Sequence, residues 1–320
     1  MKFLMVLIGL FLLATAAFAQ YPSSVLDLSY WKLTLPIDED GNGKADEIKQ
    51  PELATYEHPV YFHVNSDGTG VVFRAHCGGA TTSGSGYPRS ELREMQQGDA
   101  TQKASWSTDD GVKHVMEITQ AITHLPDVKP HVVAGQIHDA NDDVIVFRLE
   151  GSKLFIDING TDGPTLNSNY QLGEVFKVKF EVYNGVIDCY YNDQLKYSYT
   201  HSASGCYFKA GCYTQSNTSK GDDASAYGEV VIYDLLVTHG DQQPPTVSLT
   251  SPADGSTFTE GETITLQASA SDADGSISRV EFYANGNKLG EDSSAPYSYD
   301  WSGATAGTYD LYARAFDNDG

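Results

Sequence analysis

Short runs in which apolar and polar residues alternate occupy most of the chain between residues 70 and 239. Because successive side chains of a strand point to opposite faces, such alternation predicts half-buried β-strands. We expect strands at 70–76, 114–123, 131–139, 144–151, 153–160, 175–192, 207–215 and 229–239. The run 175–192 has Asn184-Gly185 between two alternating halves, which predicts a β-hairpin. The stretch VLDLSYWKL near residue 25 is expected to form one short helical turn before a strand.

Many strands at short spacing, without helical crossovers between them, predict an all-β fold, an antiparallel jelly roll sandwich over residues 20–240. The pattern is interrupted at Pro244-Pro245, which cannot continue a strand ladder, so residues 241–246 are interpreted as a linker. Beyond it, five shorter runs predict an immunoglobulin-like β-sandwich over residues 247–320. The chain stops after a turn at Gly320, and we expect this second domain to be incomplete. No aromatic-plus-polar cluster is recognisable in its sequence, and we interpret it as a spacer.

The first residues carry a lysine, an apolar run and a small-residue ending at Ala17-Phe18-Ala19. This pattern is typical of a secretory signal peptide over residues 1–19. We therefore expect a secreted protein, extracellular or periplasmic, that is a soluble monomer without a membrane anchor.

The formal net charge of −23 disfavours nucleic acid as a partner, and it disfavours any polyanion that would bind by general attraction. An anionic partner would therefore need cations gathered at one site. Four cysteines, Cys77, Cys189, Cys206 and Cys212, permit three pairings between which the sequence does not choose. One or two disulfides, or buried free thiols, are the ordinary expectations for an oxidising compartment.

Three segments place chemically capable side chains on a single face of a predicted strand. In YPRSELRE these are Arg89, Glu91 and Arg93, in GQIHD they are Gln136 and His138, and in YFKAGCYTQ they are Lys209, Tyr213 and Gln215. In the last segment, Phe208, Ala210 and Cys212 would face the core. Each segment alone has an ordinary explanation as a solvated strand face. If the three strands lie side by side, however, they present all eight side chains on one surface.

This set of groups suits the removal of a proton next to a carboxylate, followed by loss of a leaving group. It contains no recognisable glycosidase carboxylate pair, nucleophile elbow or zinc motif. It does supply histidine as a base near neutral pH, tyrosine as an acid, and arginine and glutamine as donors that offset the carboxylate charge. A uronic acid polymer offers such a proton at carbon 5 and a glycosidic oxygen at carbon 4. The predicted reaction is β-elimination, for which no cofactor and no metal are expected.

The segments RSELRE, QIH and YFKAGCYTQ, in this order, resemble the signature segments of alginate lyases of polysaccharide lyase family 7. The openings SSVLDLSYWKLTLP and DEIKQPELATY are also similar, and the resemblance covers residues 23–240. It implies a jelly roll with a groove for alginate. It also implies the catalytic set Arg89, Gln136, His138 and Tyr213, and a substrate-binding set of Glu91, Arg93, Lys209 and Gln215 in which Glu91 orients the arginines.

The same resemblance assigns roles to the base and the acid. His138 would be the base for guluronate, and Tyr213 would act as both base and acid for mannuronate. The isoleucine of QIH, Ile137, is associated in the family with activity on guluronate-containing blocks, although by strand parity it points away from the groove. Two alternatives remain, a lyase for another polyuronate such as glucuronan and a non-catalytic jelly roll that binds polyuronate.

An acidic stretch at residues 38–47 resembles a calcium loop through Asp38, Asp40 and Asn42. Its twelfth position is Lys49, where an EF-hand loop has glutamate. We expect an acidic turn without metal, with calcium as the alternative.

Overall fold

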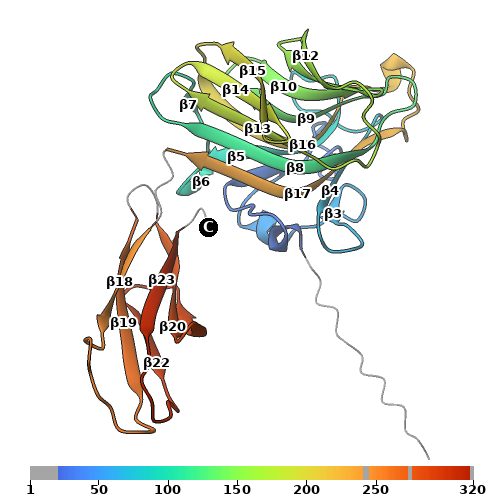
Figure 1. The fold of residues 1–320 in the computed structure, drawn as a ribbon. Coiled ribbons are helices and arrows are strands. Elements are labelled where there is room, and N and C mark those ends of the chain that lie inside the picture. The colour runs from blue at the N-terminus through green and yellow to red at the C-terminus, as the bar shows by residue number, and fades with distance from the viewer. Residues whose placement is uncertain (1–20, 241–244, 273–275, 318–320) are drawn as a thin grey trace, which may run out of the picture.

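The structure, a computed structural model, describes residues 21–240, 245–272 and 276–317, and its regular elements are almost entirely strands (Figure 1). A ten-stranded sheet has the order β12-β11-β10-β9-β16-β5-β1-β2, with β6 paired to β5 and β7 to β16. Its strands are β1 (Trp31–Thr34), β2 (Glu47–Ile48), β5 (Arg89–Gln96), β6 (Asp99–Lys103), β7 (Trp106–Ser107), β9 (His131–His138), β10 (Asp143–Glu150), β11 (Lys153–Ile158), β12 (Thr161–Asn167) and β16 (Ser204–Thr214).

A seven-stranded sheet has the order β15-β14-β13-β8-β17-β4-β3, and all the strand pairs in both sheets are antiparallel. Its strands are β3 (Phe62–Val64), β4 (Val71–His76), β8 (His114–His124), β13 (Phe176–Tyr183), β14 (Val186–Tyr191), β15 (Gln194–Thr200) and β17 (Tyr227–His239). Short 3₁₀ turns, η1 (Pro22–Ser24), η2 (Glu52–Thr55) and η3 (Thr218–Lys220), complete this part. The all-β jelly roll sandwich predicted from the alternating pattern is therefore confirmed.

One large apolar core is built from alternate residues of the strands of both sheets. On β16, for example, Phe208, Ala210 and Cys212 are fully buried, as the parity of that strand predicts. The predicted hairpin joins β13 to β14, and both Asn184 and Gly185 have positive φ, +48° and +77°, as a type I′ turn requires. The helical turn expected near residue 25 is a 3₁₀ turn that lies slightly earlier, in η1.

A buried polar network connects the two sheets near the end of β17. Glu94 of β5 points into the core and accepts hydrogen bonds from the indole of Trp106 (3.1 Å) and from the ring of His239 (2.5 Å). The Nδ1 atoms of His239 and His114 are 2.5 Å apart, and Nε2 of His114 lies 3.1 Å from Asp110. Burial, and then the neighbouring His239, lower the pKa of His114. This network satisfies a carboxylate that sequence parity alone places on the apolar face of β5.

All four cysteines are buried and free in the structure, which matches the second of the two expectations for them. Burial raises the pKa of each thiol, to about 11 for Cys77 and about 12 for Cys206. Buried thiols of raised pKa are unreactive, so we assign these cysteines to packing.

The second domain is a sandwich of two three-stranded antiparallel sheets with a separate small core that includes Leu266, Val280 and Phe282. The sheets have the orders β18-β19-β22 and β21-β20-β23. Their strands are β18 (Thr246–Ser251), β19 (Ile264–Ser271), β20 (Ile277–Ala284), β21 (Asn287–Asp292), β22 (Tyr297–Trp301) and β23 (Leu311–Asp317). The sequence pattern predicts all of these strands except β21.

The predicted signal peptide and residues 241–244 of the predicted linker lie outside the described residues. Within the described ranges, none of the helical segments has the length and apolar character needed to cross a membrane.

Candidate active site

The three segments singled out in the sequence form neighbouring strands, with β16 between β9 and β5. In the register of the sheet, Tyr213 lies opposite Arg89, and Lys209 lies opposite both Arg93 and Gln136. The side-by-side arrangement on which the functional prediction depends is therefore present.

Two glycines allow the middle of this surface to form. Gly135 has φ +111° and Gly211 has φ +132°, both in the region that favours glycine. The register between β16 and β9 shifts between Lys209 and Tyr213, the interval that contains Gly211 and, on β9, Gly135. This shift is a β-bulge. A Cβ atom on Gly211 would lie 2.6 Å from the carbonyl oxygen of Ser90, so a larger residue would push β16 away from β5.

Glu91 lies at the centre of a buried network. Its Oε2 accepts hydrogen bonds from Arg89 (3.0 Å) and Lys209 (2.5 Å), and its Oε1 accepts one from Gln136 (2.5 Å). Burial opposes the ionisation of Glu91, but the positive charges of Lys209 and Arg89 outweigh it and hold its pKa below the usual value. Burial, and then the charge of Arg89, lower the pKa of Lys209 to about 8.

This network gives Glu91 a positioning role. Its side chain is 1% exposed and both of its oxygens are engaged with Arg89, Lys209 and Gln136, so its predicted contact with substrate stays a prediction. Of the two arginines that it was expected to orient, it holds only Arg89. Arg93 lies over the ring of Tyr207, 3.7 Å from the ring centroid.

Tyr213 is held by contacts on its ring and on its hydroxyl. The guanidinium of Arg89 lies 3.7 Å from the centroid of the Tyr213 ring. The Tyr213 hydroxyl is 2.9 Å from Oγ of Ser85, which also accepts a hydrogen bond of 3.0 Å from Arg89. Tyr213 is half-buried, so its phenol is fixed and still accessible.

The imidazole of His138 is oriented so that its Nε2 has no hydrogen-bond partner among the described residues. Its Nδ1 lies 2.8 Å from the carbonyl oxygen of Asp139, and because a carbonyl only accepts, Nδ1 carries the proton. The lone pair is then on Nε2. Burial is the main cause of the lowered pKa of His138, and the charge of Lys209 also lowers it. His138 is therefore a neutral base near pH 7.

Sequence reasoning missed Tyr207 and Ser85. The Tyr207 ring stacks on His138, with centroids 5.1 Å apart, and the guanidinium of Arg93 lies over the same ring. Tyr207 has the same strand parity as Lys209 and Tyr213, which could have identified it. Ser85 lies in the loop before β5, where no periodicity exists, and only the tertiary structure brings it to Tyr213.

Two further predicted residues, Ile137 and Gln215, lie away from the Glu91 network. Ile137 is fully buried in the core, so it points away from the groove as predicted. Gln215 follows the end of β16, and its backbone N–H donates to the carbonyl of His131, at the other end of β9 from His138. A role for Gln215 in binding a distant sugar stays a prediction.

The acidic loop at residues 38–47 brings together a different set from the one predicted. Carboxylate oxygens of Asp38, Asp40 and Asp46 lie within 4.8 Å of one another. The side chain of Asn42 instead bonds within the loop, donating to Asp40 and accepting from Lys44. Asp46 thus joins Asp38 and Asp40 as a possible ligand, and calcium binding here stays the untested alternative to an acidic turn without metal.

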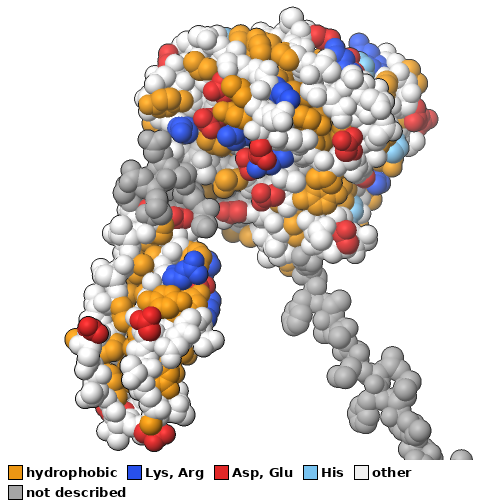
Figure 2. Space-filling model, in the orientation of Figure 1, with side chains coloured by type: hydrophobic (Ala, Val, Ile, Leu, Met, Phe, Trp, Pro, Cys, Tyr) orange, Lys and Arg blue, Asp and Glu red, His pale blue; other side chains and the backbone are white. Residues whose placement is uncertain are grey.

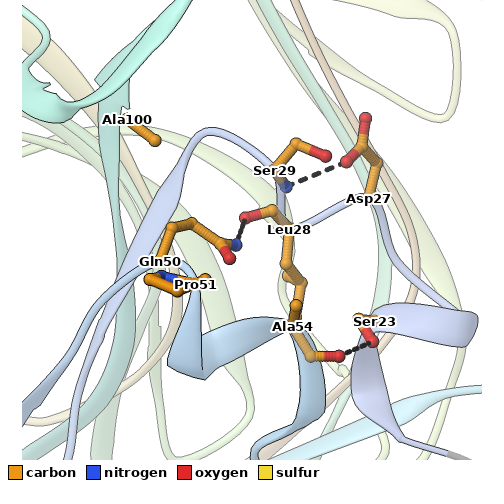
Figure 3. Close-up of a pocket in the computed structure, with 8 residues that line it drawn as sticks. All are labelled: Ser23, Asp27, Leu28, Ser29, Gln50, Pro51, Ala54 and Ala100. Carbon is orange, nitrogen blue, oxygen red and sulfur yellow. Dashed lines mark hydrogen bonds between the residues drawn. The ribbon is translucent and has the colours of Figure 1, made fainter.

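A cavity of about 290 Å³ lies apart from these strands, and Figure 3 shows its lining. The amide of Gln50 donates to the carbonyl of Leu28, and the hydroxyl of Ser23 donates to that of Ala54. The Ser23 bond joins η1 to η2, and the Gln50 bond joins the residues next to these turns. Asp27 of the lining accepts from the backbone N–H of Ser29. We therefore assign this cavity to the packing of the N-terminal segment and place the active site on β5, β9 and β16.

Comparison with known proteins identifies the family of each domain. The alginate lyase family matches residues 26–239, and the bacterial Ig domain family matches residues 245–313. A curated alginate lyase from Klebsiella pneumoniae is 31% identical over 298 residues, which cover 73% of this chain and 96% of that protein. The structure of alginate lyase AlgAT5, of polysaccharide lyase family 7, is 60% identical and has a TM-score of 0.66. It covers 69% of this chain and 99% of its own.

An alginate lyase structure from Corynebacterium sp. is 50% identical over the same shares of the two chains, with a TM-score of 0.66. The chain belongs to the alginate lyases of polysaccharide lyase family 7 and carries a bacterial immunoglobulin domain after its catalytic domain.

Proposed function

We propose that this lyase cleaves alginate by β-elimination, with guluronate-containing blocks as its favoured substrate. The observation that carries the proposal is the free Nε2 of His138, on the same sheet face as the Arg89–Glu91–Gln136–Lys209 network. A neutral imidazole with an available lone pair can take the C5 proton of a uronate. Cationic and amide donors fixed in a buried network can offset the charge that builds on the carboxylate as this proton leaves.

The second half of the reaction needs an acid for the glycosidic oxygen. Tyr213 fits this role because its hydroxyl is accessible and its ring and oxygen are both fixed, by Arg89 and Ser85. Elimination breaks the C5–H and C4–O bonds, forms the C4=C5 double bond, and moves one proton to the base and one to the departing oxygen. For mannuronate, where proton and leaving group lie on the same face, Tyr213 would serve both steps.

A solved relative supports these two assignments. A family 7 alginate lyase, 25% identical, was crystallised with the substrate GGMG after one histidine and one tyrosine had been substituted. A histidine and a tyrosine whose loss preserves bound substrate fit the base and acid roles of His138 and Tyr213.

The proposal is tested by following the ultraviolet absorbance of the unsaturated product with polyguluronate, polymannuronate and glucuronan in parallel. We expect the fastest rise with polyguluronate and none with glucuronan. A rise with glucuronan alone would favour the other polyuronate lyase, and binding without any rise would favour a non-catalytic jelly roll. His138→Ala and Tyr213→Phe should each remove most turnover and preserve the circular dichroism spectrum.

Matched controls exist in the seven-stranded sheet. His124→Ala removes a half-buried histidine that stacks on Tyr227. Tyr190→Phe removes the hydroxyl of a ring over which Lys179 lies. Both control variants should retain the parent activity. Equal losses of activity in the control and site variants would show that all four substitutions act by destabilising the fold.

We also propose that the protein is secreted, on the basis of residues 1–19. N-terminal sequencing of the exported protein should begin at Gln20. A mature chain that retains residues 1–19 would contradict this proposal.

A further inference from the structure

The second domain concentrates its cationic residues on one sheet. Arg279, Lys288 and Arg314 are all the lysine and arginine between residues 245 and 320. They lie on β20, β21 and β23, and Figure 2 shows Lys and Arg side chains next to hydrophobic ones on this part of the small domain. Val280 and Phe282 of β20 face the core, so the intervening residues face outward.

The outward positions bring three aromatic rings into the same face. Tyr283 lies opposite Tyr312 in the register, and Arg279 lies opposite Phe316. The tyrosine rings are stacked, with centroids 4.9 Å apart and planes within 2°, and Tyr312 is 37% exposed. Arg279 lies over Phe316, 3.8 Å from its centroid. Along β23, Tyr312 and Phe316 flank Arg314, which lies opposite Glu281 of β20. An exposed aromatic surface of this kind can pack against the apolar C–H face of a sugar ring.

Two of the three cations are already neutralised. Glu281 accepts hydrogen bonds from Lys288 (2.7 Å), Arg279 (3.2 Å) and the hydroxyl of Tyr283 (2.5 Å). Arg314 differs, because it is exposed and forms no ion pair among the described residues, although it lies opposite Glu281 in the register and also bonds the Tyr283 hydroxyl. The guanidinium has five N–H donors, so those not bonded to Tyr283 remain available for a bidentate bond to a carboxylate.

The opposite sheet of the same domain has a different outer face. The outward residues of β19 and β22 include Thr265, Gln267, Ser269 and Ser298, which are small or neutral. Cross-strand stacking and ion pairs stabilise a sheet wherever they occur. The two faces nevertheless differ in kind, since only one combines exposed rings with an unpaired cation.

We propose that the face formed by Tyr283, Tyr312, Arg314 and Phe316 binds uronate units of an acidic polysaccharide. A sugar ring would lie on the exposed tyrosine, and its carboxylate would pair with Arg314. The domain is otherwise strongly acidic, so charge complementarity confines an anionic polymer to this face. Alginate is chosen as the probe because the inference rests on the proposed function for the identity of the polymer. Attachment of both domains to one polymer would raise the effective concentration of substrate at the catalytic groove.

The test compares the full chain with a Tyr312→Ala/Arg314→Gln double variant. Both are prepared with His138→Ala so that the polymer is not cut. Retention on calcium alginate particles at physiological salt should fall about tenfold or more in the double variant, on the scale of a lost charge-assisted hydrogen bond together with a lost ring contact. The matched control is Phe258→Ala, which removes another exposed aromatic of the same domain and should leave retention unchanged. Arg314→Lys keeps the charge and loses the bidentate geometry, and we expect an intermediate effect.

A second measurement separates this site from the catalytic groove. Hydrogen exchange of the full chain with and without alginate oligosaccharides should show protection in β20 and β23, and the double variant should lose that protection. With the catalytic residues intact, the double variant should cleave short soluble oligomers at the parent rate. Equal retention of parent and double variant, or retention on dextran sulfate but not on alginate, would overturn the proposal. If retention falls as expected but the parent chain with His138 intact does not cleave alginate, only the proposed function is overturned.

Discussion

Replacement of Glu91 by glutamine tests the network that supports the chemistry. The substitution keeps the shape of the side chain and removes the charge that holds Arg89, Lys209 and Gln136. Removal of one partner from a buried ion pair typically costs about 3–5 kcal/mol of stability. At about 2–4 °C per kcal/mol for a domain of this size, the melting temperature should fall by about 6–20 °C.

The loss of activity should exceed the loss of folded protein. Without the carboxylate, Arg89 and Gln136 are no longer held in place for the charge that builds in the transition state. The loss of one such preorganised donor typically lowers kcat about 10²–10³-fold. The assay is the initial rate of product absorbance at a temperature at which circular dichroism shows the variant folded.

The matched control for this variant is Glu229→Gln in the seven-stranded sheet. Glu229 pairs with Arg74 at 2.6 Å, and the pair is more exposed than that of Glu91. Because the Glu229 pair is only partly buried, the control should lose less stability than Glu91→Gln and should retain its activity. A folded Glu91→Gln variant with turnover within about threefold of the parent would refute the positioning role, because the scale of donor loss is far larger.

Further predictions concern pH and the contacts of Tyr213. Because the pKa of His138 is lowered, kcat/KM should keep its full value as the pH falls to 6.5, the ordinary histidine pKa, and should decline only below it. An acid limb above pH 7 would contradict the role of His138 as the base. An alkaline limb near pH 8 should follow the loss of charge on Lys209, and Lys209→Arg should move this limb upward; an unchanged limb would assign it to another group. Ser85→Ala should lower kcat about 2–10-fold, on the scale of one hydrogen bond, with KM little changed and with rescue by Ser85→Thr. Burial also lowers the pKa of His76 and His114, so the unfolded chain binds more protons than the native one as pH falls through 6.5. Stability is therefore full above this pH and declines below it, and a melting temperature that rises between pH 7.5 and pH 5.5 would contradict this reasoning.

The elements that could be predicted from sequence were those with a regular period. On β16, the alternation of Phe208, Ala210 and Cys212 with Lys209 and Tyr213 gave both the strand and the direction of each side chain. The short strand β21 (Asn287–Asp292) was missed, because NKLGED does not alternate apolar and polar residues.

Strand parity likewise identified the face on which Arg89, Gln136 and His138 lie, but not their partners. Glu91 looked like an exposed charge between two arginines, and the structure shows a buried carboxylate that contacts three strands. Parity tells which side of a strand a residue occupies. Burial depends on the loops and neighbouring strands that cover that side, and these come from elsewhere in the chain.

The second domain shows the same division between local and tertiary information. Five of its six strands could be predicted from local alternation, because backbone geometry makes the period of a strand a local property. The aromatic and cationic face could not, because Tyr283 and Tyr312 are far apart along the chain and meet only through the pairing of β20 with β23. The sequence by itself thus determined the strands with a regular alternation, the orientation of their side chains and the family. The tertiary structure decided which of those side chains touch, because strand order and register are set by long-range pairing and core packing.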